Sequence, residues 1–380
     1  MTVVGSSADL QSIVASQVAP NAVDVDRSGA FPRANIDALA NAGVLGILSA
    51  SEVGGSALGL RAAADTTEQL ARACGSTAMV VLMHYAATAV IEAHGPEETR
   101  RAIAAGKHLT TLAFSEAGSR SHFWAPLSTA ARVNGHVRLD AHKSWVTSAG
   151  QADSYVWSSK PLSESGPMTL WLVPSNASGL QQQGVFDGLG LRGNGSTPVS
   201  AEDVQLPPAA MLGPDGGGLD LALSLVLPTF NVLSAAFSLG LMEATATEAA
   251  QHLTETRLQH IDQSLAQQQA VRLDFARLRL EVDRTRTLLE DTLSALESGR
   301  ADAMLRVLEV KAAASEAALQ VTDLAMKLCG GSAFRKELGV ERRFRDARAA
   351  RVMAPTTDAL LDFIGRATLG LPLLDDVVAR

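Results

Sequence analysis

The sequence predicts an α+β protein, because helical periodicity at both ends of the chain encloses a middle third in which strand patterns dominate. In the first third, apolar residues recur at helical spacing, as in residues 36–43. From Asp220 onward the same period returns in longer segments. We therefore expect an N-terminal helical domain over residues 1–108, a β-domain over 109–213 and a C-terminal four-helix bundle domain over 214–380.

Glycines mark the expected ends of helices in the N-terminal third. Gly43 follows an apolar-periodic segment and predicts a helix stop, while Gly54 and Gly55 predict a loop before a helix over residues 58–74. Residues 24–32 have the composition of a linker between two helices.

Strand signals fill the middle third. An Asn134-Gly135 pair flanked by alternating apolar residues predicts a β-hairpin over residues 133–140. Residues 154–158 and 168–173 are further strand candidates, separated by prolines and a glycine.

The last third predicts long helices over residues 221–250, 263–297 and 305–328. The first is apolar almost throughout and should be buried, whereas the second carries enough Arg and Asp for a solvated face. A final helix after Pro355 would complete a four-helix bundle.

Composition narrows the function classes. The net charge is -8, with 32 Lys and Arg against 40 Asp and Glu, which disfavours a nucleic-acid-binding protein. The two cysteines, Cys74 and Cys329, suggest a reducing compartment without disulfides. No apolar run approaches the roughly 20 residues that span a bilayer, and no leader is evident. We expect a soluble cytoplasmic protein with no metal site and no membrane partner.

Several segments, taken in order, resemble the acyl-CoA dehydrogenase superfamily. Residues 115–121, Ser-Glu-Ala-Gly-Ser-Arg-Ser, are similar to the family's Thr-Glu-Pro-Gly-Ala-Gly-Ser. Residues 143–149, Lys-Ser-Trp-Val-Thr-Ser-Ala, are similar to its Lys-x-Trp-Ile-Thr-Asn-Ala. Near the C-terminus a glycine pair precedes Arg-Asp-Ala at 345–347, as in the family's C-terminal signature. The resemblance covers most of the chain and implies a flavoprotein oxidoreductase.

The resemblance also implies where the flavin lies. FAD, with FMN as the alternative, would sit between the β-domain and the bundle, with Trp145 and Thr147 against the ring and Ser121 near the pyrophosphate. The glycine pair would approach the flavin of a neighbouring subunit, so a homo-oligomer, dimer or tetramer, is expected. The implied cofactor-binding residues are Phe114, Ser115, Ser121, Trp145, Thr147, Gly330, Gly331 and Thr356.

Without the resemblance these residues have ordinary structural interpretations. Trp145 would be a buried core or sheet residue, the glycine pair a helix C-cap, and Thr356 the N-cap of the last helix.

The chain departs from the family where proton chemistry is expected. Ala354 occupies the position of the usual glutamate base and cannot accept a proton. The alternative base position and the adjacent CoA-binding arginine are occupied by Phe230 and Asn231. The family's Arg-x-x-Phe-Gly motif is only partly present: Arg257 matches its arginine, but no Phe-Gly follows.

A replacement base must therefore come from elsewhere. His84 and His122 are the catalytic candidates, since an imidazole can act as acid or base, although a packed or surface histidine is the more common case. Asp358 lies about one helical turn from Ala354, and Glu116 belongs to the family scaffold.

Three functions remain open. The first is dehydrogenation of an unusual acyl thioester, bound to CoA or to a carrier protein, with electrons passed to an electron-transfer flavoprotein. The second is a monooxygenase that uses reduced flavin from a flavin reductase. The third is a non-catalytic member of the family, against which the retained Ser115, Trp145, Thr147 and Thr356 argue. The missing base and CoA contacts suggest a role in secondary metabolism.

Overall fold

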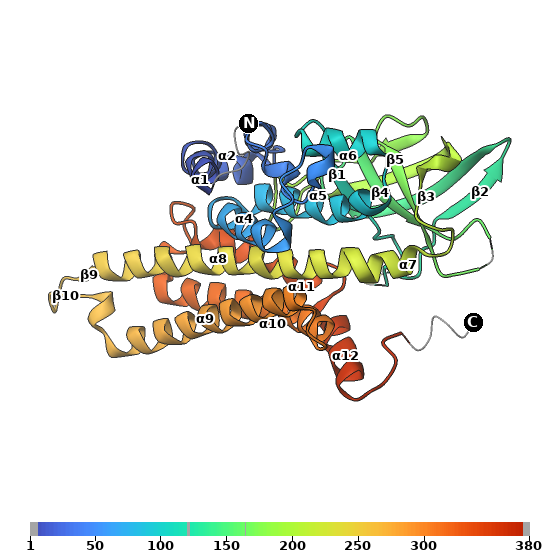
Figure 1. The fold of residues 1–380 in the computed structure, drawn as a ribbon. Helices are drawn as coiled ribbons and strands as arrows, with labels where there is room; N and C mark the ends of the chain where they lie inside the picture. The colour runs from blue at the N-terminus through green and yellow to red at the C-terminus, as the bar shows by residue number, and fades with distance from the viewer. Residues whose placement is uncertain (1–6, 120–121, 164, 375–380) are drawn as a thin grey trace.

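The computed structural model describes residues 7–119, 122–163 and 165–374, and it has the predicted α+β architecture (Figure 1). The N-terminal helices and the middle β-domain lie side by side on one face of the long C-terminal helices, which run across the molecule. The predicted fold class is confirmed.

The N-terminal helices pack around α5 (Gly75–His94), which is apolar on all sides and buried over most of its length. The predicted linker over residues 24–32 was wrong in part. Helix α2 continues to Ser28, because Ala22 and Val25 bury one of its faces, and Gly29 ends it with a left-handed backbone at φ 68°. The other helices are α1 (Ser7–Ile13), α3 (Arg33–Asn41), α4 (Gly59–Ala73) and α6 (Glu97–Ala104).

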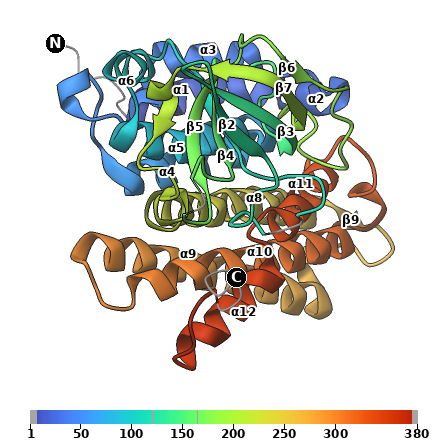
Figure 2. The same ribbon diagram turned by 90° about the vertical axis from the view of Figure 1, so that its right-hand side faces the viewer.

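The middle domain consists of two four-stranded sheets, ordered β1-β4-β5-β8 and β2-β3-β7-β6 (Figure 2). The predicted hairpin is present: β2 pairs antiparallel with β3, and Asn134 and Gly135 both take positive φ angles in the turn. The strands are β1 (Thr110–Ala113), β2 (Thr129–Val133), β3 (His136–Val146), β4 (Ser154–Ser159), β5 (Thr169–Pro174), β6 (Leu180–Gln182), β7 (Thr197–Leu206) and β8 (Met211–Leu212).

The bundle consists of α8 (Leu227–Glu255), α9 (Gln269–Ser298), α10 (Ala303–Cys329) and α11 (Val340–Val352), with the short α7 (Gly218–Leu221) before it. The sequence predicts the helix after Pro355 as the fourth helix of the bundle, and this prediction is wrong. That helix, α12 (Thr357–Thr368), packs against α10 at the edge of the bundle. Periodicity did not reveal α11 because it is rich in arginine and buries few side chains.

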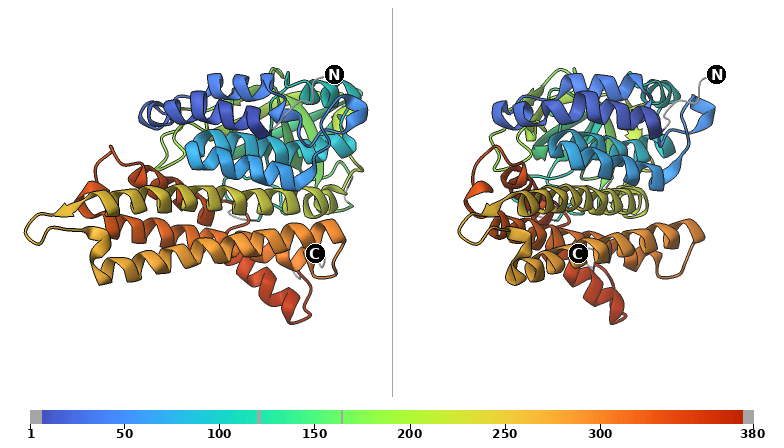
Figure 3. Two further views of the ribbon diagram at one scale, coloured as in Figure 1. Left: turned by 60° about the vertical axis from the view of Figure 1, so that its left-hand side comes forward. Right: turned by 90° about the vertical axis from the view of Figure 1, so that its left-hand side faces the viewer.

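The expected start of α9 at residue 263 was also wrong. Residues 257–264 form a hairpin of β9 (Arg257–Leu258) and β10 (Gln263–Ser264), which projects beyond the end of the bundle (Figure 3). From Gln269 onward, α9 buries a residue every three or four positions, and Gly299 ends it in a left-handed conformation.

Helix α8 lies at the centre of the fold and packs against α4, α5, α9, α10 and α11. A Cβ on Gly240 would lie 2.3 Å from the Glu68 carbonyl oxygen, so glycine permits the close approach of α4. Contrary to the expectation from the sequence, Gly75–His94 and Gly218–Glu255 are long and apolar enough to span a membrane. Both are buried against other elements, at 78% and 89% of the apolar window, and form the core of the protein.

Candidate flavin site between the middle domain and the bundle

Three segments of the middle domain form the first wall of the candidate site. The Ser144 amide donates to the Ser115 carbonyl at 2.9 Å, which joins the segment after β1 to the end of β3. The Ser148 amide donates to the Asn194 carbonyl at 2.9 Å, which adds the segment before β7. These bonds place Ser115 beside the end of β3 that carries Trp145, and Thr147 beside the segment before β7.

A buried ion pair fixes this wall from behind. The Lys143 ammonium lies 2.5 Å from Glu116 Oε1 and also donates to the carbonyl and hydroxyl oxygens of Ser158. Glu116 accepts further hydrogen bonds from the Leu127 and Ser128 amides and from the Ser128 hydroxyl. Burial raises the pKa of Glu116, but Lys143 and these donors lower it by more, so the net shift is downward. Glu116 is a scaffold residue, as expected.

Trp145 departs from the usual behaviour of a large aromatic residue. Its side chain is 71% exposed, and its backbone has φ 57°, a conformation that is strained for a bulky residue. Exposing the apolar surface of an indole to water costs free energy, so this placement is typical of an aromatic side chain that stacks on a flat ligand. The burial expected of an ordinary core tryptophan is not observed.

The hydroxyl groups next to Trp145 fit a bound polar ring. Thr147 is buried, and its Oγ1 lies 3.0 Å from Ser196 Oγ. In the part of the chain that the structure describes, the buried Ser148 Oγ and Thr197 Oγ1 have no hydrogen-bond partner. Both hydroxyls are buried beneath this surface, as are unpaired hydroxyls elsewhere in the described core, so they do not by themselves mark a ligand site. The exposed Trp145 ring beside the Thr147 hydroxyl is what fits a flavin at this wall.

The second wall is the segment between α11 and α12. Thr356 is the N-cap of α12, with Oγ1 accepting from the Ala359 amide at 3.4 Å, as its position after a proline predicted. Ala354, where the family carries its base, is partly exposed in this segment. Asp358 is exposed on the first turn of α12.

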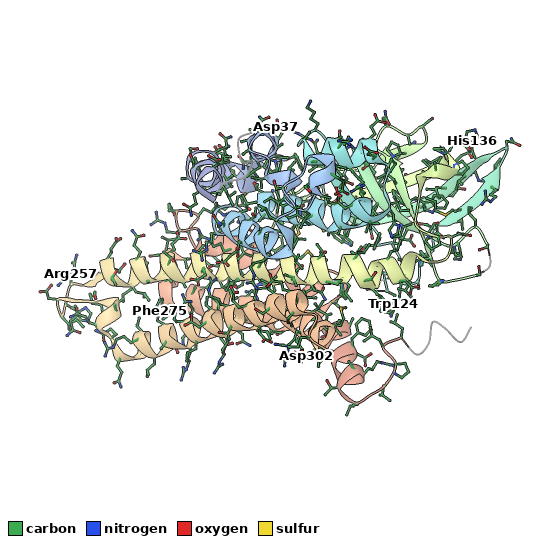
Figure 4. All side chains as sticks on the ribbon, in the orientation of Figure 1. Asp37, Trp124, His136, Arg257, Phe275 and Asp302 are labelled. Atoms are coloured by element: carbon green, nitrogen blue, oxygen red, sulfur yellow. The ribbon has the colours of Figure 1, made fainter. Side chains whose placement is uncertain are left out.

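An aromatic contact joins the two walls. Trp124, in the loop that follows Ser115, packs against Phe363 of α12 with ring centroids 5.4 Å apart, and it lies on the side of the middle domain that faces α12 (Figure 4). Phe123 and His122 stand edge-on to Trp124 at 5.1 and 4.9 Å. The sequence analysis missed Phe123, Trp124 and Phe363. Two consecutive aromatic residues in a chain with 4% aromatics were the available signal.

The structure gives the two candidate histidines different environments. His84 is fully buried, its Nδ1 accepts from the Thr110 amide at 3.2 Å, and its Nε2 lies 3.1 Å from the Leu45 carbonyl. Burial lowers the pKa of His84 to about 4, so the ring is neutral. With both nitrogens bonded to backbone, His84 has a structural role in this geometry, and we leave it out of the catalytic proposal.

His122 remains available as an acid or base. It is exposed, and its Nδ1 lies 2.9 Å from the Ser119 carbonyl. Because a carbonyl can only accept, Nδ1 carries a proton, and in the neutral ring Nε2 is the nitrogen that can accept one. Ser121, the implied pyrophosphate ligand, lies outside the described residues.

Gly330 and Gly331 do not join the other site residues within one chain. They follow the C-terminus of α10, and the segment from 330 to 339 lies at the opposite end of α11 from α12 (Figure 1). A Cβ added to either glycine would meet no atom within 4 Å. The pair therefore borders open space, where another molecule could approach.

In some family members the first long bundle helix carries the base and, next to it, an arginine that binds CoA. Here those two positions hold Phe230 and Asn231, which supply neither a carboxylate nor a cation. Phe230 is 7% exposed, and its ring centre lies 5.8 Å from Lys311 Nζ. Asn231 is fully buried, and its Nδ2 donates to the Val307 carbonyl at 3.1 Å.

A helical domain, a double-sheet domain and a helical bundle, in this order along the chain, are typical of one class of flavoprotein oxidoreductases. The acyl-CoA dehydrogenase N-terminal, middle and C-terminal domain families match residues 7–106, 111–204 and 216–369. The chain belongs to the acyl-CoA dehydrogenase superfamily.

Full-length relatives agree with this assignment. The cyclohex-1-ene-1-carbonyl-CoA dehydrogenase of Geobacter metallireducens is 28% identical over 95% of this chain and 96% of its own. The structure of butyryl-CoA dehydrogenase from Megasphaera elsdenii has a TM-score of 0.89 at 21% identity and covers 95% of this chain and 96% of that one. The prolyl acyl carrier protein oxidase has a TM-score of 0.87 at 18% identity and covers 97% and 100%.

Proposed function

We propose that the chain binds FAD between the middle-domain wall and the segment 353–356 and dehydrogenates an acyl thioester. The observation that carries this proposal is Trp145, whose indole is held 71% exposed by a backbone with φ 57° beside the Thr147 hydroxyl. Bound FAD would supply the hydride acceptor. FMN is the alternative flavin.

Each wall has a role in this proposal. Trp145 would flank the flavin ring, and the Thr147 hydroxyl would contact its edge together with the backbone at Phe114 and Ser115. Thr356 would approach from the opposite wall, where its side chain already caps α12. Trp124 and Phe363 would exclude water from one end by closing the gap between the walls.

His122 is the proposed proton acceptor. Its tautomer leaves the Nε2 lone pair free, since Nδ1 is bonded to the Ser119 carbonyl. Its ring also packs against Trp124. Trp124 in turn contacts Phe363 of α12, the helix that begins after Thr356, so His122 lies where the two walls meet. Ala354, at the position where the family usually carries its glutamate base, has no group that could accept the proton.

One observation favours a second candidate, the monooxygenase. Ala354 and Phe230 both lack a carboxylate, so neither position used by the family for α-proton removal can serve. Oxygen transfer from a reduced flavin supplied by a reductase does not require that base.

A carrier-bound substrate fits the chain better than free acyl-CoA. Asn231 stands where the family binds the CoA portion, but its amide is committed to a backbone carbonyl inside the bundle. The fold is shared with a prolyl acyl carrier protein oxidase, so it can accept a substrate presented by a carrier. Such a substrate would place the protein in secondary metabolism.

The working form is proposed to be a homo-oligomer, dimer or tetramer. The open space at Gly330 and Gly331, far from the chain's own second wall, suits the approach of a neighbouring subunit's flavin. The exposed Phe334, 85% accessible beside the pair, would be covered in the same contact.

The proposal is tested by loading the protein with FAD and offering butyryl-CoA and butyryl-carrier protein. Anaerobic bleaching of the flavin by either thioester, faster with the carrier, supports dehydrogenation. Incorporation of labelled dioxygen into product, only after chemical reduction, supports the monooxygenase. A protein that binds no flavin contradicts both.

Two variants sharpen this test. His122→Asn keeps a donor for the Ser119 carbonyl but removes the base, so bleaching should slow at least tenfold, in line with general-base contributions of about 10²–10⁴. Ala354→Glu restores a carboxylate at the family position and should accelerate bleaching by butyryl-CoA. An unchanged rate in His122→Asn would remove this histidine from the reaction.

A further inference from the structure

Lys311 is a charged residue that neither the sequence analysis nor the proposed chemistry uses. It lies in α10 among alanine and valine residues, and its side chain is fully buried. Among the described residues, no carboxylate forms an ion pair with it, and burial lowers its pKa. A buried lysine without a counter-ion is costly unless its three N–H groups are satisfied.

The three N–H groups of Lys311 are satisfied by backbone oxygens. Nζ donates to the carbonyls of Pro355 at 2.7 Å, Met353 at 3.1 Å and Ala350 at 3.4 Å. The first two belong to the second wall of the candidate site, and the third lies in the last turn of α11. On its other side, Nζ lies 5.8 Å from the centre of the Phe230 ring.

This geometry suits the ammonium form. Burial lowers the pKa of Lys311 to about 7, but three acceptors match the three donors of an ammonium, whereas a neutral amine would point a lone pair at a carbonyl. The carbonyls at the C-terminus of α11 also favour a cation. Lys311 thereby terminates α11 from inside the bundle.

The carbonyls bound by Lys311 bracket the residue that faces the expected chemistry. Met353 and Pro355 stand on either side of Ala354, and Thr356 follows immediately as the N-cap of α12. Because the carbonyl before Ala354 and the carbonyl after it are both bound by Lys311, the path of the backbone at Ala354 and the direction of its side chain are fixed. The start of α12 is fixed by the same contact.

We propose that Lys311 is a positioning residue that holds Ala354 and Thr356 at the flavin by binding the carbonyls of Met353 and Pro355. The part that concerns flavin rests on the function proposed above. Because active-site geometry matters at the scale of about 1 Å, release of this segment should alter the flavin environment as well as stability.

The test compares four forms of the protein. Lys311→Met keeps the length of the side chain without donors, Lys311→Arg keeps the charge and donors, and Lys311→Gln keeps two N–H groups. Leu278→Ala, at a fully buried site in α9, is the control for loss of bundle stability alone. Amide hydrogen exchange is measured on the flavin-free proteins, and the visible spectrum and dissociation constant on the FAD-loaded ones.

Lys311→Met should speed exchange at Met353, Ala359 and Leu360 by about tenfold or more, because their bonds to Ala349 and Thr356 depend on the held segment. It should also shift the FAD absorption maximum and weaken FAD binding. Lys311→Gln should be intermediate, and Lys311→Arg close to wild type.

The proposal is overturned if Lys311→Met exchanges like wild type over residues 350–360, or if Leu278→Ala reproduces its local exchange and spectral change. If Lys311→Met does not fold, the same comparison between Lys311→Gln and Lys311→Arg decides. Failure of wild-type protein to bind FAD would refute the proposed function, while the exchange data would still test the positioning role.

Discussion

Each wall of the candidate site is held by a fully buried lysine, and the two ammonium groups have different kinds of hydrogen-bond partner. In the middle domain, Lys143 is paired with the Glu116 carboxylate at 2.5 Å. In the bundle, Lys311 is met by three backbone carbonyls and by no carboxylate among the described residues. Burial lowers the pKa of both, to about 8 for Lys143 and about 7 for Lys311.

The difference shows how the partner determines what a buried charge does. A carboxylate carries a full charge, so Glu116 and Lys143 neutralise each other and join the segment after β1 to β3 through their side chains. Carbonyl dipoles carry only partial charges, and Lys311 therefore holds a stretch of backbone. Removing one member strands a charge in the first wall, whereas in the second it strands only neutral carbonyls.

The largest effect is expected for Lys143→Met, which leaves Glu116 buried and unpaired. Loss of one partner of a buried ion pair costs roughly 3–5 kcal/mol, because a full charge is left unpaired. Lys311→Met leaves only neutral carbonyls, at about 1–3 kcal/mol for each one that no other donor reaches, and the Ala350 carbonyl keeps the Ser315 hydroxyl as a donor. Urea unfolding of both variants measures the difference. The double variant Lys143→Met/Glu116→Leu should recover stability relative to Lys143→Met, and equal loss in the two would mean that the pair is not what holds this wall.

A smaller, pH-dependent effect is expected at Asp346, which joins α11 to the middle domain through the Leu191 amide at 2.6 Å. Burial raises the pKa of Asp346 to about 6, so its protonation stabilises the folded state below about pH 4, and this contribution is lost as the pH rises through 6. Between these two pH values the contribution of Asp346 to the free energy of unfolding changes by about 3 kcal/mol.

Asp346→Asn is neutral at every pH and still offers an oxygen to Leu191. Unfolding midpoints of the variant and wild type should therefore converge as the pH falls from 7 to 4, with the variant the more stable at pH 7. Parallel profiles would show that Asp346 does not take up a proton on folding.

The smallest effect on stability is expected for Trp145→Ala, because its side chain is mostly in water. The free energy of unfolding should change by about 0.5 kcal/mol or less. The dissociation constant for FAD should rise about tenfold, the value of one aromatic stacking contact. Leu280→Ala, at an exposed apolar residue of α9 outside both walls, is the control and should leave FAD binding unchanged.

The middle-domain wall was predictable from sequence because its residues lie in short, contiguous motifs. The Asn134-Gly135 turn fixed the hairpin register, and the segments containing Ser115 and Trp145 were recognisable by resemblance. The N-cap role of Thr356 followed from its place after a proline. Local chemistry determines each of these features, so a single sequence reveals them.

The bundle wall could not be predicted in the same way, because its partners are distant in sequence. Lys311 contacts carbonyls about forty residues away, and carbonyls have no sequence signature. Helix α11 buries a mixed set of side chains that includes Asp346, which hides its periodicity. Phe363 became part of the site only through its contact with Trp124.

The most direct test of the central claim is the retention of FAD through gel filtration by wild type and by the Trp145→Ala/Thr147→Ala double variant. Wild-type protein should elute with close to one FAD per chain, and the double variant should elute largely without it while keeping the same elution volume. Equal FAD occupancy in the two proteins, or none in wild type, would contradict a flavin site at this wall.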